Sequence, residues 1–100
     1  MKTTIQEIDG KMVVSLRGEL DTAAAVKVEQ DLQVLYENEG KDVIFDCTEL
    51  EYIASSGLRI LLSILKKAKA SGSKVTLQNV NDDIKNVFRM TGFINLFEFE

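Results

Sequence analysis

Apolar residues in this chain follow two periods, one typical of strands and one typical of helices. Thr4–Ile8 and Met12–Leu16 read as short strands on either side of an Asp9-Gly10 pair. Asp-Gly between two such strands is a strong signal for a two-residue turn. The pattern therefore predicts an antiparallel hairpin at the start of the chain.

Three helices follow, and each is predicted to end at a glycine. They begin at Asp21 or Thr22, at about Ser56, and after Asn81; the glycines are Gly40, Gly72 and Gly92. Asp and Asn are preferred N-cap residues, and glycine is common just past a helix end. The apolar stripes expected to be buried are Ala25, Val28, Leu32 and Leu35 in the first helix, and Leu58, Leu61, Leu62 and Leu65 in the second.

Strands alternate with these helices over the rest of the chain. They are predicted at Asp42–Cys47, Lys74–Gln78 and Leu96–Phe99, and Val43-Ile44-Phe45 is the continuous apolar run of a strand buried on both faces. Such alternation implies right-handed crossovers and parallel strands. We predict one α/β domain over residues 1–100, with a mixed, mainly parallel sheet opened by an antiparallel hairpin and three main helices.

Composition narrows the possible functions. The net charge is −4, there is no histidine, and Cys47 is the single cysteine. Nucleic-acid binding needs a broad basic face, which an acidic chain does not favour. Histidine is the usual general base and metal ligand, so its absence argues against catalysis and metal binding. No serine or cysteine has a base beside it in the sequence, and no glycine-rich phosphate loop is present. We expect a cytoplasmic interaction module without enzymatic activity, metal, cofactor, nucleic-acid or membrane binding, with Cys47 packed in the core.

The polar turn before the second helix is the main candidate site. Ser55-Ser56-Gly57 opens a strongly apolar helix, where unpaired backbone N–H groups collect. A serine there is either a plain cap or a place that suits phosphate. A helical wheel puts Ser56 on a polar arc with Arg59, so we expect an accessible Ser56 hydroxyl and a Ser55 side chain nearer the sheet.

Other candidates have structural alternatives. Asp46 ends a strand at the edge where α/β folds place their sites, and it is equally suited to cap the following turn. Asp21 is expected to cap the first helix, and Asp82 and Asp83 to be first-turn acids rather than a metal pair. Ile60 and Ile64 extend the apolar arc of the second helix, which favours core packing over an exposed contact.

These residues resemble the STAS domain of bacterial anti-sigma-factor antagonists. The resemblance covers nearly the whole chain and includes Gly18-Glu-Leu-Asp21, Val43-Ile-Phe-Asp46 and Ser55-Ser-Gly-Leu58. It implies binding to an anti-sigma factor that is also a serine kinase, which phosphorylates the serine just before the glycine, here Ser56. The implied partner contacts are Asp21, Ser55, Ser56, Gly57 and Arg59. ATP and magnesium would belong to the kinase, and the free chain is expected to be a monomer.

The family usually has an aspartate before the two serines, and this chain has Ala54. We therefore expect a poorer kinase substrate than an Ala54→Asp variant. Three alternatives stay open: a STAS module that binds without being switched, a small-ligand or anion site at the second helix, and a receiver-like phosphoryl acceptor using Asp46. The last would need an acidic pair after the first strand to hold magnesium, where this chain has a hairpin.

Overall fold

The computed structural model describes residues 1–37 and 40–100. The strands are β1 (Lys2–Ile8), β2 (Lys11–Leu20), β3 (Val43–Asp46), β4 (Leu50–Ile53), β5 (Val75–Gln78) and β6 (Glu98–Phe99). The helices are α1 (Thr22–Asp31), α2 (Ser55–Ala70) and α3 (Asp82–Met90), and a 3₁₀ helix, η1 (Leu32–Glu37), continues α1. The predicted order of elements is confirmed, and β4 is an element that the sequence did not predict.

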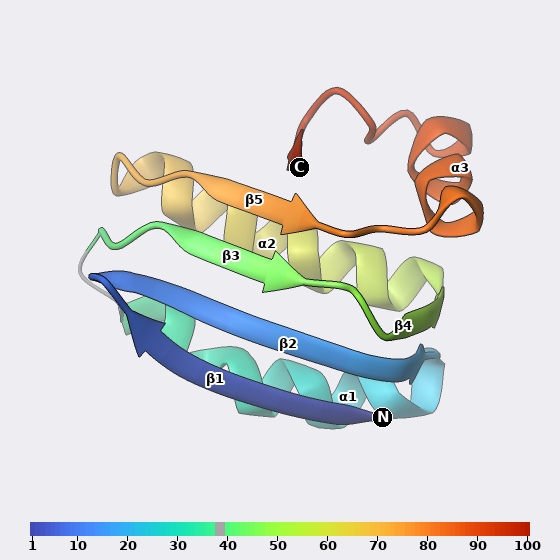
Figure 1. The fold of residues 1–100 in the computed structure, drawn as a ribbon, viewed down its shortest axis with the longest axis horizontal. Coiled ribbons are helices and arrows are strands. Elements are labelled where there is room, and N and C mark those ends of the chain that lie inside the picture. The colour runs from blue at the N-terminus through green and yellow to red at the C-terminus, as the bar shows by residue number, and fades with distance from the viewer. Residues whose placement is uncertain (38–39) are drawn as a thin grey trace.

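One mixed sheet organises the molecule. Its strand order is β1-β2-β3-β5-β6, with β4 paired to the far end of β2. Among the described residues, β1 and β2 pair antiparallel and the other strand pairs are parallel. The expected α/β fold with an opening hairpin is therefore confirmed. Figure 1 shows α1 and α2 lying behind the sheet, while α3 packs at one end.

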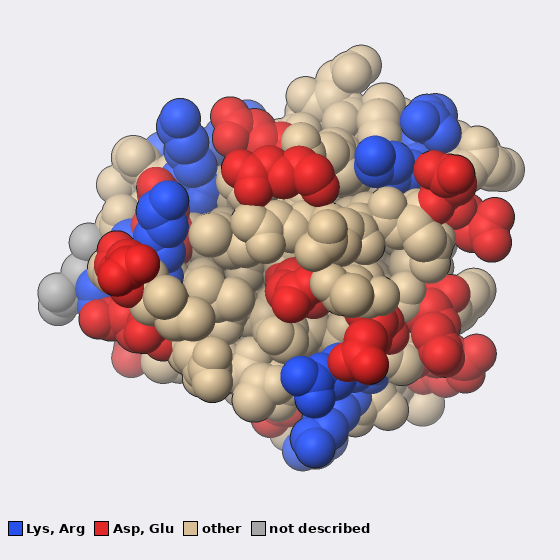
Figure 2. All heavy atoms as spheres, in the orientation of Figure 1, with Lys and Arg blue, Asp and Glu red and all other residues tan. Residues whose placement is uncertain are grey.

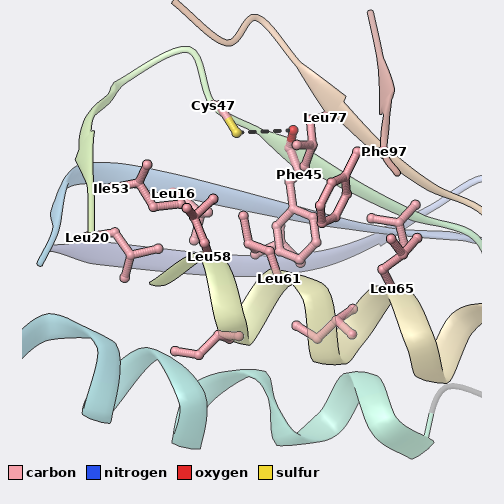
Figure 3. Packing of buried hydrophobic residues seen from close by; sticks show 14 of the residues in the cluster. Leu16, Leu20, Phe45, Cys47, Ile53, Leu58, Leu61, Leu65, Leu77 and Phe97 are labelled. Carbon is pink, nitrogen blue, oxygen red and sulfur yellow. Dashed lines mark hydrogen bonds between the residues drawn. The ribbon is translucent and has the colours of Figure 1, made fainter. Parts of the chain in front are cut away.

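The core lies between the sheet and these two helices. Inward-facing residues alternate along the strands, and Leu16 and Phe45 are fully buried beneath α2. Figure 3 shows the α2 leucines pointing toward these strand residues. Ile60 and Ile64 are 7% and 1% exposed, so the prediction that they pack in the core is confirmed. This packing holds α2 firmly along the sheet, which fixes the position of its first turn.

The first helical segment differs from the prediction in its geometry. Its regular α-helix ends at Asp31, and the chain continues as a 3₁₀ helix to Glu37. The predicted stripe is nevertheless buried through Leu35, because both helix types return side chains to the same face within a few turns. Residues 38–39, just before the predicted end at Gly40, lie outside the described residues.

Candidate functional site

The polar turn lies where α2 begins, at the edge formed by the carboxyl ends of β2, β3 and β5 (Figure 1). Strand β4 places it there. Leu20 of β2 pairs with Ile53 of β4, and the backbone N–H of Ala54 donates to the Leu20 carbonyl at 2.8 Å. The helix starts at the next residue. The short strand thus anchors the start of α2 to the end of β2.

Ala54 is the N-cap residue of α2, and no side chain caps this helix. Of the two interpretations left open for these serines, the plain cap is therefore wrong. Ser55 and Ser56 are instead the first two helical residues. The helix start keeps backbone N–H groups without a side-chain acceptor, and these favour a nearby negative charge.

The two serines have the opposite exposure to that predicted. Ser55 is exposed, whereas Ser56 is half-buried and its Oγ is screened from solvent. The Ser56 hydroxyl also has no hydrogen-bond partner within residues 1–37 and 40–100. The wheel placed Ser56 on the polar arc correctly but could not anticipate that α1 and η1 would border that arc. Because no base is within hydrogen-bond distance of Oγ, the geometry gives Ser56 no means of acting as a nucleophile itself.

Gly57 is buried and makes room for the sheet. An added Cβ would lie 2.7 Å from Leu20 Cγ and 3.0 Å from Ile53 Cγ1. Real Cβ atoms do not approach a neighbour that closely, so α2 could not sit so near these strand ends with a larger residue. The structure gives Gly57 a packing role and no exposed side of its own. The implied partner contact at Gly57 stays a prediction.

A pocket of about 240 Å³ opens beside Ser56. It lies between α1, η1 and α2, and its lining residues are Glu29, Tyr36, Ser56, Arg59, Ile60 and Ser63. The Ser63 hydroxyl donates to the Arg59 carbonyl within α2 at 3.0 Å. Arg59 is exposed and makes no ion pair with residues 1–37 or 40–100. Sequence reasoning missed Glu29 and Tyr36, because nothing near them in the chain marks them as neighbours of Ser56.

Asp21 caps α1 as predicted. Its Oδ1 accepts the Ala24 backbone N–H at 2.8 Å, and the residue is half-buried. This leaves the second carboxylate oxygen available on the same edge of the sheet. The capping bond holds the carboxylate in one place, so any contact through Asp21 would be preorganised.

Asp46 stabilises the turn after β3. Its Oδ1 accepts hydrogen bonds from both the hydroxyl and the backbone N–H of Thr48. The Thr48 hydroxyl bond is the main reason that the pKa of the Asp46 carboxyl lies below its ordinary value. Asn79 donates in turn to the Thr48 hydroxyl at 3.0 Å. Of the two interpretations left open, turn capping is the one that the geometry supports.

Cys47 is buried next to this turn, as expected of a core residue. Burial raises the pKa of its thiol to about 12, with the Asp46 charge adding to the effect. The Sγ donates only a weak hydrogen bond to the Phe45 carbonyl, at 3.7 Å (Figure 3). A thiol of this kind is almost wholly protonated at neutral pH and is a poor nucleophile.

Acidic side chains surround the start of α2. Figure 2 shows acidic side chains at the end of the molecule where β4 and α3 lie, with basic side chains beside those at α3, and a mixture of acidic and basic side chains at the opposite end. The exposed carboxylates contributed by the elements of this edge are Glu19, Glu49, Glu51, Asp82 and Asp83. Of these, Glu49 is paired with Arg17 at 3.0 Å. The edge that carries Ser55 and Ser56 is therefore negative even without phosphate.

The described residues contain neither a metal-binding cluster nor a membrane-spanning helix. No group of three or more metal-binding side chains occurs among residues 1–37 and 40–100. Within these residues, no helix has the length and apolar character needed to cross a bilayer.

Comparison with known proteins agrees with this geometry. The family model of the STAS domain matches residues 2–100. BtrV of Bordetella bronchiseptica, named as a candidate anti-sigma factor antagonist, is 30% identical over 97 residues, covering 97% of this chain and 84% of BtrV. The anti-sigma-B factor antagonist of Listeria monocytogenes is 29% identical over 87 residues, covering 87% of this chain and 76% of that protein.

Solved structures share the fold. The Bacillus anti-sigma factor antagonist SpoIIAA in its unphosphorylated form superposes with a TM-score of 0.77 at 18% identity, covering 99% of this chain and 87% of SpoIIAA. The phosphorylated form gives a TM-score of 0.76 at 19% identity, covering 99% of this chain and 91% of SpoIIAA. With a family match over almost its full length, the chain belongs to the STAS domain family, and its named relatives are bacterial anti-sigma factor antagonists.

Proposed function

We propose that this chain is a bacterial anti-sigma factor antagonist that is switched by phosphorylation of Ser56. In the unmodified state it docks on an anti-sigma factor and so frees a sigma factor. The docked partner is also a serine kinase, which brings its own ATP and magnesium. Family membership, the names of the relatives and the two solved forms of SpoIIAA support this function. A regulator of this kind works in the cytoplasm, and we expect the free chain to be a monomer without a cofactor.

The Ser56 hydroxyl is the observation that carries the proposal. It lies in the first turn of a helix, where the positive end of the macrodipole suits a phosphate. It has no hydrogen-bond partner, so turning it outward to a kinase breaks no bond. A buried hydroxyl without a partner is unfavourable by about 1–3 kcal/mol, which favours any rotation that gives it one. Ser55 is exposed, so the test must exclude it as the phosphorylated residue.

Residues around Ser56 suit a positively charged partner surface. Asp21 and Ser55 border the start of α2 on the acidic edge of the sheet, and Arg59 follows one turn later. Complementary charge chiefly raises the rate of encounter and sets the orientation of docking. The contact itself would close over the first turn of α2, where a neutral hydroxyl fits and a bulky anion does not.

Phosphate on Ser56 would change this surface without disturbing the fold. It adds about −1.5 to −2 charges and three acceptor oxygens. The helix start stabilises that charge, so the domain stays folded. In the interface, the same group must lose much of its hydration and displace the partner, and docking is lost.

Titration calorimetry with the anti-sigma factor kinase of the same bacterium tests this proposal. The unmodified chain should bind, and the protein phosphorylated on Ser56 should bind at least tenfold more weakly. Ser55→Ala should bind and be phosphorylated like the natural chain. Equal binding of the modified and unmodified forms would refute the switch, and no binding of either would refute the antagonist function.

A further inference from the structure

The pocket beside Ser56 holds a cation in reach of that residue. Arg59 follows Ser56 by three positions on α2, and residues spaced by three on a helix are neighbours on its surface. Both side chains line the pocket of about 240 Å³ between α1, η1 and α2. No carboxylate of residues 1–37 or 40–100 lies within 4 Å of the Arg59 guanidinium.

We propose that this pocket receives the phosphate of phosphorylated Ser56 and that Arg59 is its counter-ion. The inference rests on the proposed function, since it assumes the modified serine, and it adds an intramolecular role for Arg59. A guanidinium can bind a phosphate through two parallel hydrogen bonds, a geometry that an ammonium group lacks. Ser56 lines the pocket while its Oγ is screened from solvent, so a rotation about the Cα–Cβ bond would bring the phosphate into the pocket beside Arg59.

Two groups on the opposite wall shape the site. Tyr36 of η1 is half-buried and has no hydrogen bond from the described residues to its hydroxyl, which leaves a donor for a phosphate oxygen. Glu29 of α1 carries the opposing charge on this wall, but it forms no ion pair with Arg59. The Ser63 hydroxyl is already committed to the Arg59 carbonyl. The pocket thus contains one cation and one anion that are not paired before modification, so the Arg59 guanidinium is free to bind the phosphate.

The consequence for regulation is specific. An Arg59 side chain bound to phosphate is no longer available to a docked partner. Phosphorylation would therefore remove a cationic contact from the docking surface in addition to adding bulk at Ser56. It would also tie the first turn of α2 to the α1 and η1 side of the domain through the bound phosphate.

Phosphoserine incorporated at position 56 by genetic code expansion tests this without any kinase. The readout is the second pKa of the phosphate, followed by ³¹P NMR across a pH titration. A nearby cation favours the dianion, so Arg59→Gln should raise this pKa by about 0.5–1 unit relative to the unsubstituted phosphoprotein. Glu29→Gln removes a repelling charge and should lower it by a few tenths of a unit.

Lys66→Gln is the matched control, because it removes an exposed cation of the same helix outside the pocket. It should leave the phosphate pKa unchanged. The Arg59 Nε–H resonance should also move on phosphorylation in the natural chain. Equal phosphate pKa values in the Arg59→Gln and unsubstituted proteins would overturn the inference. Failure of the partner to bind or to phosphorylate the chain would refute the proposed function instead, and it would leave this result unaffected.

Discussion

Replacing Gly57 with alanine should destabilise the protein through one contact. The added Cβ would lie 2.7 Å from Leu20 Cγ and 3.0 Å from Ile53 Cγ1, and both neighbours are buried. Overpacking of this kind lowers the free energy of unfolding by about 1–3 kcal/mol, whereas the better helix propensity of alanine raises it by at most about 1 kcal/mol. We expect the free energy of unfolding to fall by about 1–2 kcal/mol, measured by urea denaturation at 25 °C.

A double-mutant cycle identifies the cause of that loss. Leu20→Ala removes the atoms that clash, so Gly57→Ala should cost much less in the Leu20→Ala background than in the natural chain. Gly92→Ala is the control, because Gly92 has a φ of +80° and nothing within 4 Å of an added Cβ. Its cost is backbone strain and should be the same in both backgrounds. An equal cost of Gly57→Ala in both backgrounds would refute the close approach of α2 to β2.

Three further predictions concern the site and its edge. Ser56→Ala should leave the free energy of unfolding unchanged or raise it by up to about 1 kcal/mol, since it removes a desolvated hydroxyl. Ser56→Asp should weaken partner binding without a large change in the unfolding midpoint. Ala54→Asp should cap α2, which should raise the free energy of unfolding by about 0.5–2 kcal/mol, and it should raise the initial phosphorylation rate by roughly one to two decades. Ala54→Asn should stabilise the fold in the same way without changing this rate. Equal rates for Ala54→Asp and the natural chain would show that the acid is dispensable. The lowered pKa of Asp46 stabilises the fold at pH values above about 3.9, the pKa of an unfolded aspartate, and this contribution is lost as the pH falls through the folded pKa. The stability difference between the natural chain and Asp46→Asn, followed by urea denaturation, should therefore shrink below about pH 4, and a difference independent of pH would contradict the assignment.

Local signals predicted most of the fold. Asp21 and Asn81 cap α1 and α3 through the expected side-chain bonds, because capping depends on residues only three apart. Strand β4 escaped detection because its four residues have an exposed pair between two buried ends, which is not the alternation of a strand. Its pairing with β2 comes from tertiary structure.

The candidate site could be located from the sequence but not oriented. The Ser-Ser-Gly turn and the start of α2 followed from polarity and period. The exposure of Ser55 and the burial of Ser56 depend on where α1 and η1 lie against α2, which no local pattern encodes. The packing role of Gly57 likewise depends on how closely Leu20 and Ile53 approach it, which the sequence does not show.

Mapping the phosphate by mass spectrometry tests the central claim most directly. The natural chain, Ser55→Ala and Ser56→Ala are incubated with the anti-sigma factor kinase of the same bacterium and with Mg²⁺ and ATP. The account predicts one phosphate on Ser56 in the natural chain and in Ser55→Ala, and none in Ser56→Ala. A phosphate on Ser55, or an unmodified chain after binding to an active kinase, would contradict it.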